Sequence, residues 1–167
     1  MELVELAGMT PEGRAELAAG EANPFGINDL SWRESDRYLA LRDDGKLVAA
    51  AGLVVATVEA GTHAFDVVGV GGVIVARPHR GTGLMRSVMD AAMARAEQIG
   101  PRFAMLFCSF ANARRYARFG FREIAGTVTA DQPGSRTVTM GEVAMWRPLR
   151  ADATWPDGPV RVLGLPF

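Results

Sequence analysis

The stretch that decides the fold runs from residue 73 to residue 85 and reads Val73-Ile74-Val75-Ala76-Arg77-Pro78-His79-Arg80-Gly81-Thr82-Gly83-Leu84-Met85. Its β-branched run predicts a strand, its Pro, Arg and Gly residues predict a loop, and the apolar residues that follow at helical spacing predict an amphipathic helix. A helix start carries about four unpaired N–H groups and a partial positive charge. Glycines there leave these donors open to an anion, and Arg80 adds a charge that suits a phosphate. The stretch therefore predicts a cradle for a diphosphate.

The strand before this loop contains Gly69, Gly71 and Gly72. The loop glycines alone would fit an ordinary strand-to-helix turn equally well, so the strand glycines decide between the two interpretations. Glycine inside a strand often marks a bulge or a close approach of another chain or a ligand. An extended ligand would pair with the exposed strand amides while its phosphate end lies in the loop. Coenzyme A, with two amides in its pantetheine arm and a pyrophosphate, has this shape.

Length and composition exclude several classes of protein. A chain of 167 residues with 49% hydrophobic and 22% charged residues is typical of one globular domain. A net charge of −1 argues against a nucleic-acid partner. The first residues lack the pattern of a signal peptide, and the apolar stretch over 47–58 is about half the ~20 residues of a membrane helix. Cys108 is the single cysteine, which excludes an internal disulfide and a cysteine zinc site. We therefore expect a cytoplasmic protein that binds no metal and no membrane.

Capping, turn and periodicity signals predict the other elements. They are a short helix from Thr10-Pro11 to Gly20, a loop or broken helix over 21–35 that contains Asn28-Asp29, strands at 37–42, 47–59, 63–76, 102–108, 121–124 and 136–146, a turn at 43–46, and helices at 83–100 and 112–119. Helices mixed with hairpin-linked strands indicate an α/β (α+β) fold. We expect a single domain with a mixed, mostly antiparallel central sheet flanked by helices.

Two motifs in this order resemble the GNAT superfamily of N-acetyltransferases. One is Arg80-x-x-Gly83 after the valine strand, and the other is Tyr116-x-x-x-Gly120-Phe121, about 36 residues later. The resemblance covers roughly residues 30 to 147. Around these motifs the chain looks most like the aminoglycoside 2′-N-acetyltransferases and the enhanced-intracellular-survival acetyltransferases. The resemblance implies a GNAT domain over residues 1–150. We expect residues 151–167 to be a C-terminal tail that packs near the acceptor site.

The resemblance implies transfer of an acetyl group from acetyl-CoA to a primary amine of a small molecule, by direct attack in a ternary complex. It places the pantetheine arm along the backbone of Val73, Ile74 and Val75, with a further contact at Ala111 and Asn112. It places the pyrophosphate at Arg80 and the amides of Gly81, Thr82, Gly83, Leu84 and Met85. Met85 stands where the superfamily usually has glycine or alanine, so we expect its amide to bind and its side chain to turn to the core. Superfamily members are often dimers, which makes a homodimer possible.

Tyr116 aligns with the tyrosine that such enzymes use as general acid. The general base is an open question, because Gly71 stands where the aminoglycoside enzymes have a glutamate. Asp66 and Glu59 on neighbouring predicted strands, a chain of water molecules, and the carboxylate of Phe167 are the candidates. The last follows from the enhanced-intracellular-survival enzymes, which are thought to use a C-terminal carboxylate. An alternative function is a catalytically weak acyl-CoA-binding module that acts as a sensor or partner subunit.

Overall fold

The computed structural model describes residues 1–26 and 29–167. The loop expected over 21–35 includes residues 27 and 28, so that part of the prediction lies outside the described residues. In chain order the elements are β1 (Glu2–Leu6), α1 (Pro11–Ala18), β2 (Arg37–Asp43), β3 (Lys46–Ala60), β4 (His63–Val75), the 3-10 turn η1 (Arg77–His79), α2 (Leu84–Ile99), β5 (Phe103–Cys108), α3 (Phe110–Ala117), β6 (Arg122–Glu123), β7 (Val128–Gln132), β8 (Arg136–Thr139), β9 (Val143–Pro148) and β10 (Val160–Val162).

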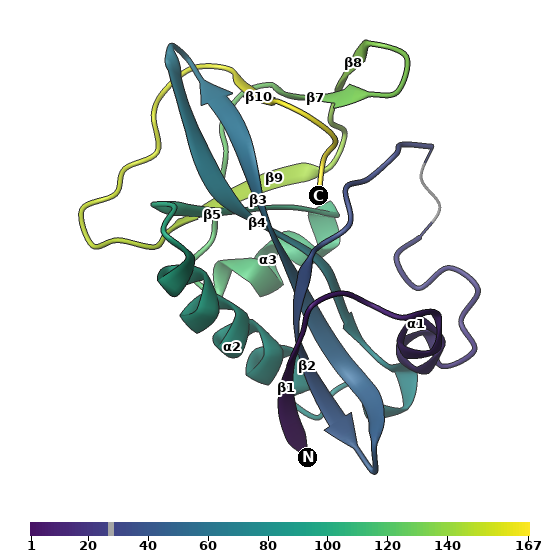
Figure 1. The fold of residues 1–167 in the computed structure, drawn as a ribbon. Coiled ribbons are helices and arrows are strands. Elements are labelled where there is room, and N and C mark those ends of the chain that lie inside the picture. The colour runs from purple at the N-terminus through teal and green to yellow at the C-terminus, as the bar shows by residue number, and fades with distance from the viewer. Residues whose placement is uncertain (27–28) are drawn as a thin grey trace.

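The strands form one sheet whose centre is the long β3–β4 hairpin (Figure 1). Its order is β6-β9-β5-β4-β3-β10-β7-β8, and β2 pairs with the first half of β3 and with β1. The pairs β4–β5 and β10–β7 are parallel, and the other pairs are antiparallel. The prediction of a mixed, mostly antiparallel sheet flanked by helices in one α/β domain is therefore confirmed.

Helices cover both faces of the sheet (Figure 1). The apolar stripe of α2, which includes Val88, Met89 and Ala92, packs on one face in the largest buried cluster. On the other face Leu17 of α1 belongs to a smaller cluster with Tyr38. The near-continuous apolar sequence of residues 47–54 in β3 follows from this arrangement, since both faces of this part of the strand are covered and all of these residues are buried. The alternation of side chains along β2 and β3 thus assigns neighbouring residues to opposite layers.

One strand prediction is wrong, and three strands were not expected. The strand predicted over 136–146 is two strands, β8 and β9, separated by residues 140–142. The two strands pair with different neighbours: β8 pairs with β7, whereas β9 pairs with β5 and β6. The strands β1, β7 and β10 were missed. β10 brings residues 160–162 of the tail between β3 and β7.

The feature that positions the site is the separation of β4 from β5. Their parallel pairing covers only Val68 to Val70, opposite Ala104 to Leu106. Beyond Val70 the two strands part, while β5 stays paired with β9 as far as Cys108. The pairing of β4 with β3 shifts register between Ala50 and Gly52, which confirms the bulge that the strand glycines predict. The strand edge beyond Val70 is therefore available at the level where α2 begins.

Candidate active site

The loop between β4 and α2 has two residues with left-handed backbone, Gly81 at φ 80° and Gly83 at φ 87°. Side chains at these positions would be strained, so the turn requires glycine at both. Within the described residues, no backbone N–H from Gly81 to Arg86 donates a hydrogen bond to the protein. The first bond of the helix runs from the Ser87 N–H to the Gly83 carbonyl, at 3.3 Å. A row of open donors therefore lies at the positive end of α2.

The side chain of Arg80 is occupied by the protein itself. Its Nε donates to the Val75 carbonyl at 3.0 Å, and its terminal nitrogens donate to both carboxylate oxygens of Glu21, just after α1. These hydrogen bonds lower the pKa of Glu21, with a further contribution from the Arg77 charge. The sequence suggested that the Arg80 charge faces a phosphate. In the structure it joins the loop to the end of β4 and to the α1 segment.

The predicted pantetheine strand alternates between the two layers of the core. Ile74 is buried in the α1 layer, whereas Val73 and Val75 pack against the α2 layer. Met85 also packs against the α2 layer, in agreement with the orientation expected for its side chain. These contacts leave the backbone edge beyond Val70 facing the side from which β5 has diverged.

The second motif lies on α3, whose N-terminus is two residues earlier than predicted. Ala111 and Asn112 are therefore in its first turn, and the Asn112 N–H donates to the Ser109 carbonyl at 3.0 Å. Tyr116 packs against the main core and makes an edge contact with Phe121, with ring centroids 6.3 Å apart. Burial, together with the Cys108 thiol, raises the pKa of Tyr116 to about 12. The phenol is therefore protonated at neutral pH and is a hydrogen-bond donor.

Cys108 lies at the end of β5 and belongs to the buried core. Burial, with a smaller effect of the Glu123 carboxylate, raises the pKa of its thiol to about 11. A thiol that keeps its proton is a poor nucleophile. This agrees with a structural role for Cys108.

The C-terminal residue lies against the glycine-containing part of β4. Phe167 is 5% exposed, and its ring packs on Phe107 of β5 with centroids 5.5 Å apart. A Cβ on Gly69 would lie 2.6 Å from this ring, and one on Gly71 would lie 3.2 Å from the Phe167 carbonyl carbon. The strand glycines were expected to allow the close approach of an extended ligand. At Gly69 the group that approaches is the ring of Phe167.

The two carboxylates considered as bases lie elsewhere. Glu59 and Asp66 are exposed and near the closed end of the β3–β4 hairpin. Asp66 accepts a hydrogen bond from the Thr57 hydroxyl at 2.7 Å. Five residues along a strand separate Asp66 from Gly71, which corresponds to roughly 17 Å. The geometry therefore brings Phe167, and neither of these acids, to Gly71.

A model of the acetyltransferase (GNAT) domain matches residues 28–124, which is more than half of the chain. The chain belongs to the GNAT acetyltransferase family. This confirms the family predicted from the two motifs and the prediction of an N-acetyltransferase. A comparison with curated protein sequences found no match.

Solved structures share the fold of this GNAT domain. The N-acetyltransferase YhbS from Escherichia coli, in complex with CoA, matches with a TM-score of 0.64 and 17% identity over 98% of this chain and 91% of that one. Eis1 from Mycobacterium abscessus matches with a TM-score of 0.59 and 19% identity over 77% of this chain and 34% of that one. N-acetylglutamate synthase from Neisseria gonorrhoeae, complexed with coenzyme A and N-acetyl-glutamate, matches with a TM-score of 0.58 and 15% identity over 90% of this chain and 36% of that one.

The GNAT domain contains a loop that sequence reasoning missed as part of the site. The buried Gln132 on β7 accepts a hydrogen bond from the Ser31 N–H at 2.8 Å and donates to the Ser31 carbonyl at 2.9 Å. The Arg33 N–H donates to the Pro166 carbonyl at 2.7 Å. These bonds hold residues 29–36 against β7 and the tail. The Ser35 hydroxyl then lies 3.8 Å from the point where a Gly71 Cβ would be. No local sequence signal marks Gln132 or Ser35, because their partners are distant in the chain.

None of the helices in the described part of this GNAT domain is long and apolar enough to cross a membrane.

Proposed function

We propose that this GNAT domain transfers an acetyl group from acetyl-CoA to a primary amine of a small molecule, by direct attack in a ternary complex. The observation that carries the proposal is the row of amides from Gly81 to Arg86 that donate to no described protein group, beside the open edge of β4. Anions bind at such helix starts because both the N–H groups and the helix dipole favour negative charge. Two proteins of similar fold, YhbS and N-acetylglutamate synthase, were solved with CoA, which supports CoA as the cofactor.

In this proposal the pyrophosphate of acetyl-CoA accepts hydrogen bonds from the amides of the Gly81–Met85 loop, which Arg80 holds in place. The pantetheine arm runs along the backbone of Val73, Ile74 and Val75, and the first turn of α3 at Ala111 and Asn112 meets its other side. The thioester then reaches the level of Gly71 and Tyr116. Holding the thioester and the amine together in this way is worth about 7–11 kcal/mol of the barrier.

The chemical step needs a proton acceptor and a proton donor. The amine nitrogen attacks the thioester carbonyl, and an N–H at the bulge near Val73 stabilises the oxyanion. The C–S bond breaks, and the thiolate takes the proton of the Tyr116 phenol. The proton of the amine passes to the Phe167 carboxylate, directly or through water, and solvent returns one to the phenolate. With its pKa at about 12, Tyr116 is a weaker acid than a free phenol, so it first stabilises the departing sulfur by a hydrogen bond and gives up its proton only as the C–S bond breaks.

The tail completes the acceptor side of this site. Residues 151–167 enter the sheet through β10 and end at Phe167, beside residues 29–36. Trp32 of this loop makes an edge contact with Phe107, with centroids 6.1 Å apart, and Phe107 contacts Phe167. We therefore propose that an acceptor with an apolar part next to its amine binds between the loop and the tail.

Release of the CoA thiol from acetyl-CoA in the presence of a panel of primary amines tests the function. Tyr116→Phe should lower kcat about 100-fold or more while the Kd for CoA stays unchanged. CoA binding without thiol release for any amine would leave the alternative, a catalytically weak binding module. If CoA does not bind at all, the cofactor assignment is wrong.

The base is tested separately by adding one glycine after Phe167, which moves the carboxylate by about 3.8 Å. This extension should lower kcat at least tenfold and remove the acidic limb of the pH–rate profile. Asp66→Asn and Glu59→Gln are matched controls, and each should keep kcat within about twofold. An extended chain with full kcat would show that the amine loses its proton by another route.

A further inference from the structure

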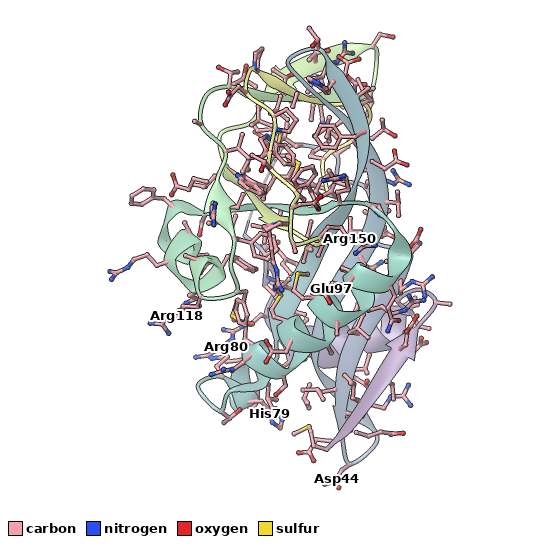
Figure 2. All side chains as sticks on the ribbon, turned by 90° about the vertical axis from the view of Figure 1, so that its left-hand side faces the viewer. Asp44, His79, Arg80, Glu97, Arg118 and Arg150 are labelled. Atoms are coloured by element: carbon pink, nitrogen blue, oxygen red, sulfur yellow. The ribbon has the colours of Figure 1, made fainter. Side chains whose placement is uncertain are left out.

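A groove next to the proposed pyrophosphate loop carries a concentration of arginines. It lies between the start of α2 and α3, has a volume of about 540 Å³, and is lined by residues that include Met85, Arg86, Asp90, Arg115, Arg118 and Arg147. Met85 belongs both to the loop and to this groove. Figure 2 shows Arg80 of the loop and Arg118 at the C-terminal end of α3 on the same side of the molecule. An anion in the groove would thus be close to one held by the loop.

Two of the four arginines have protein partners. Arg86 forms an ion pair with Asp90 one turn along α2, with Nε and Oδ2 3.7 Å apart. Arg147 donates to the Phe119 carbonyl at 2.9 Å and lies 3.7 Å from a Glu97 oxygen. These contacts orient both side chains and offset part of their charge.

The side chains of Arg115 and Arg118 form no ion pair or hydrogen bond with any described residue. Arg115 is in the last turn of α3 and Arg118, three residues later, is its C-cap residue with helical backbone, so the two like charges lie on the same side of the helix end and repel. The contrast with Arg80 is marked, because Glu21 already neutralises that guanidinium. Among the arginines that line the groove, the charge that no described residue pairs with therefore comes from Arg115 and Arg118.

We propose that Arg115 and Arg118 bind the 3′-phosphate on the ribose of CoA, and thereby distinguish CoA from dephospho-CoA. This inference rests on the proposed function, which puts the pyrophosphate of the same molecule at the neighbouring Gly81–Met85 amides. A phosphate monoester carries a charge of about −1.5 to −2 at pH 7 and offers three acceptor oxygens. Arginine forks bind such groups with paired, charge-assisted hydrogen bonds. Asp90 is the one acid of the groove, and its ion pair with Arg86 reduces its repulsion of the phosphate.

The test is calorimetric binding of CoA and of dephospho-CoA to the full chain, at low salt and without turnover. The wild type should bind CoA about tenfold more tightly or better, and the ratio should shrink as salt rises. The double variant Arg115→Ala/Arg118→Ala should lower CoA affinity to that of dephospho-CoA and leave dephospho-CoA affinity unchanged. Arg114→Ala is the matched control, since this arginine is on the same helix but does not line the groove, and it should keep the ratio.

The outcomes separate this inference from the function on which it rests. Equal affinity of the wild type for the two compounds, or an unchanged ratio in the double variant, overturns the 3′-phosphate site while acetyl-CoA turnover stands. A double variant that weakens both compounds equally also overturns it, because the arginines then act on another part of the ligand. Binding of neither compound to the wild type overturns the proposed function and this site together. Thermal unfolding of each variant verifies that it is folded.

Discussion

Replacing Gly69 with alanine tests the placement of the terminal residue, on which the proposed base depends. The added methyl carbon would lie 2.6, 2.7 and 2.9 Å from three carbons of the Phe167 ring. Carbon atoms in favourable contact are about 3.5–4.0 Å apart, so the ring must move by about 1 Å. Phe107 lies against the same ring and limits this movement. Overpacking of this kind costs about 1–3 kcal/mol.

Urea unfolding monitored by circular dichroism measures this cost. For a chain of this size the same loss of stability lowers Tm by roughly 2–12 °C. In a Phe167→Ala background the same Gly69→Ala change should cost little, because the methyl group enters the space left by the ring. The coupling free energy should therefore be about 1–3 kcal/mol. Gly141→Ala is the matched control, because its methyl group would meet nothing within 4 Å, and it should change stability by less than about 0.5 kcal/mol.

Activity measured on the same variants links the packing to the chemistry. Gly69→Ala should lower kcat for acetyl transfer and leave the Kd for CoA unchanged, since the displaced residue touches the acceptor side only. The reasoning is refuted if Gly69→Ala costs the same free energy with and without the Phe167 ring. In that case the ring does not lie over Gly69 in solution, and the Phe167 carboxylate loses its geometric support as the base.

Three further predictions concern stability, and each is measured by the urea midpoint. Folding raises the pKa of Tyr116 from 10.0 to about 12 and the pKa of Cys108 from 9.0 to about 11. The folded state therefore holds both protons more tightly than the unfolded state does. This contribution to stability is complete below about pH 9 and is lost as the pH rises to 12. Tyr116→Phe should remove the part lost between pH 10 and 12, up to about 3 kcal/mol, and an unchanged pH slope would contradict this assignment. Gln132→Leu should cost about 1–3 kcal/mol because it leaves both backbone groups of Ser31 without their partner, and a loss below about 0.5 kcal/mol would show that water replaces them. Thr10→Ala should cost about 1 kcal/mol, because the Thr10 hydroxyl accepts from the Gly13 N–H at 3.1 Å at the start of α1; Thr10→Ser should restore most of it, and no rescue would contradict the capping role.

Local signals were sufficient for most of the regular structure. The Thr10-Pro11 cap, the turn at 43–46 and the apolar period after residue 83 predicted α1, the β2–β3 hairpin and α2 within a few residues. Strand pairing was harder, since the apolar run over 136–146 does not reveal that its two halves join different neighbours. For the same reason β10 was not predicted from the Pro/Gly-rich tail. A strand is recognised by its own residues, but its partner is chosen by the whole fold.

The amino-acid sequence by itself determined the GNAT family, the glycine turn before α2 and the position of Tyr116 on a helix, because these depend on residues close together in the chain. Tertiary structure alone decided the environment of each group. It brought Glu21 to Arg80, whose guanidinium now joins the loop to β4 and to the segment after α1. It left the side chains of Arg115 and Arg118 without a partner among the described residues. It also placed Phe167 and Ser35 at Gly71 from opposite ends of the chain. Such contacts arise when the sheet closes and the tail enters it, and no short-range pattern encodes them.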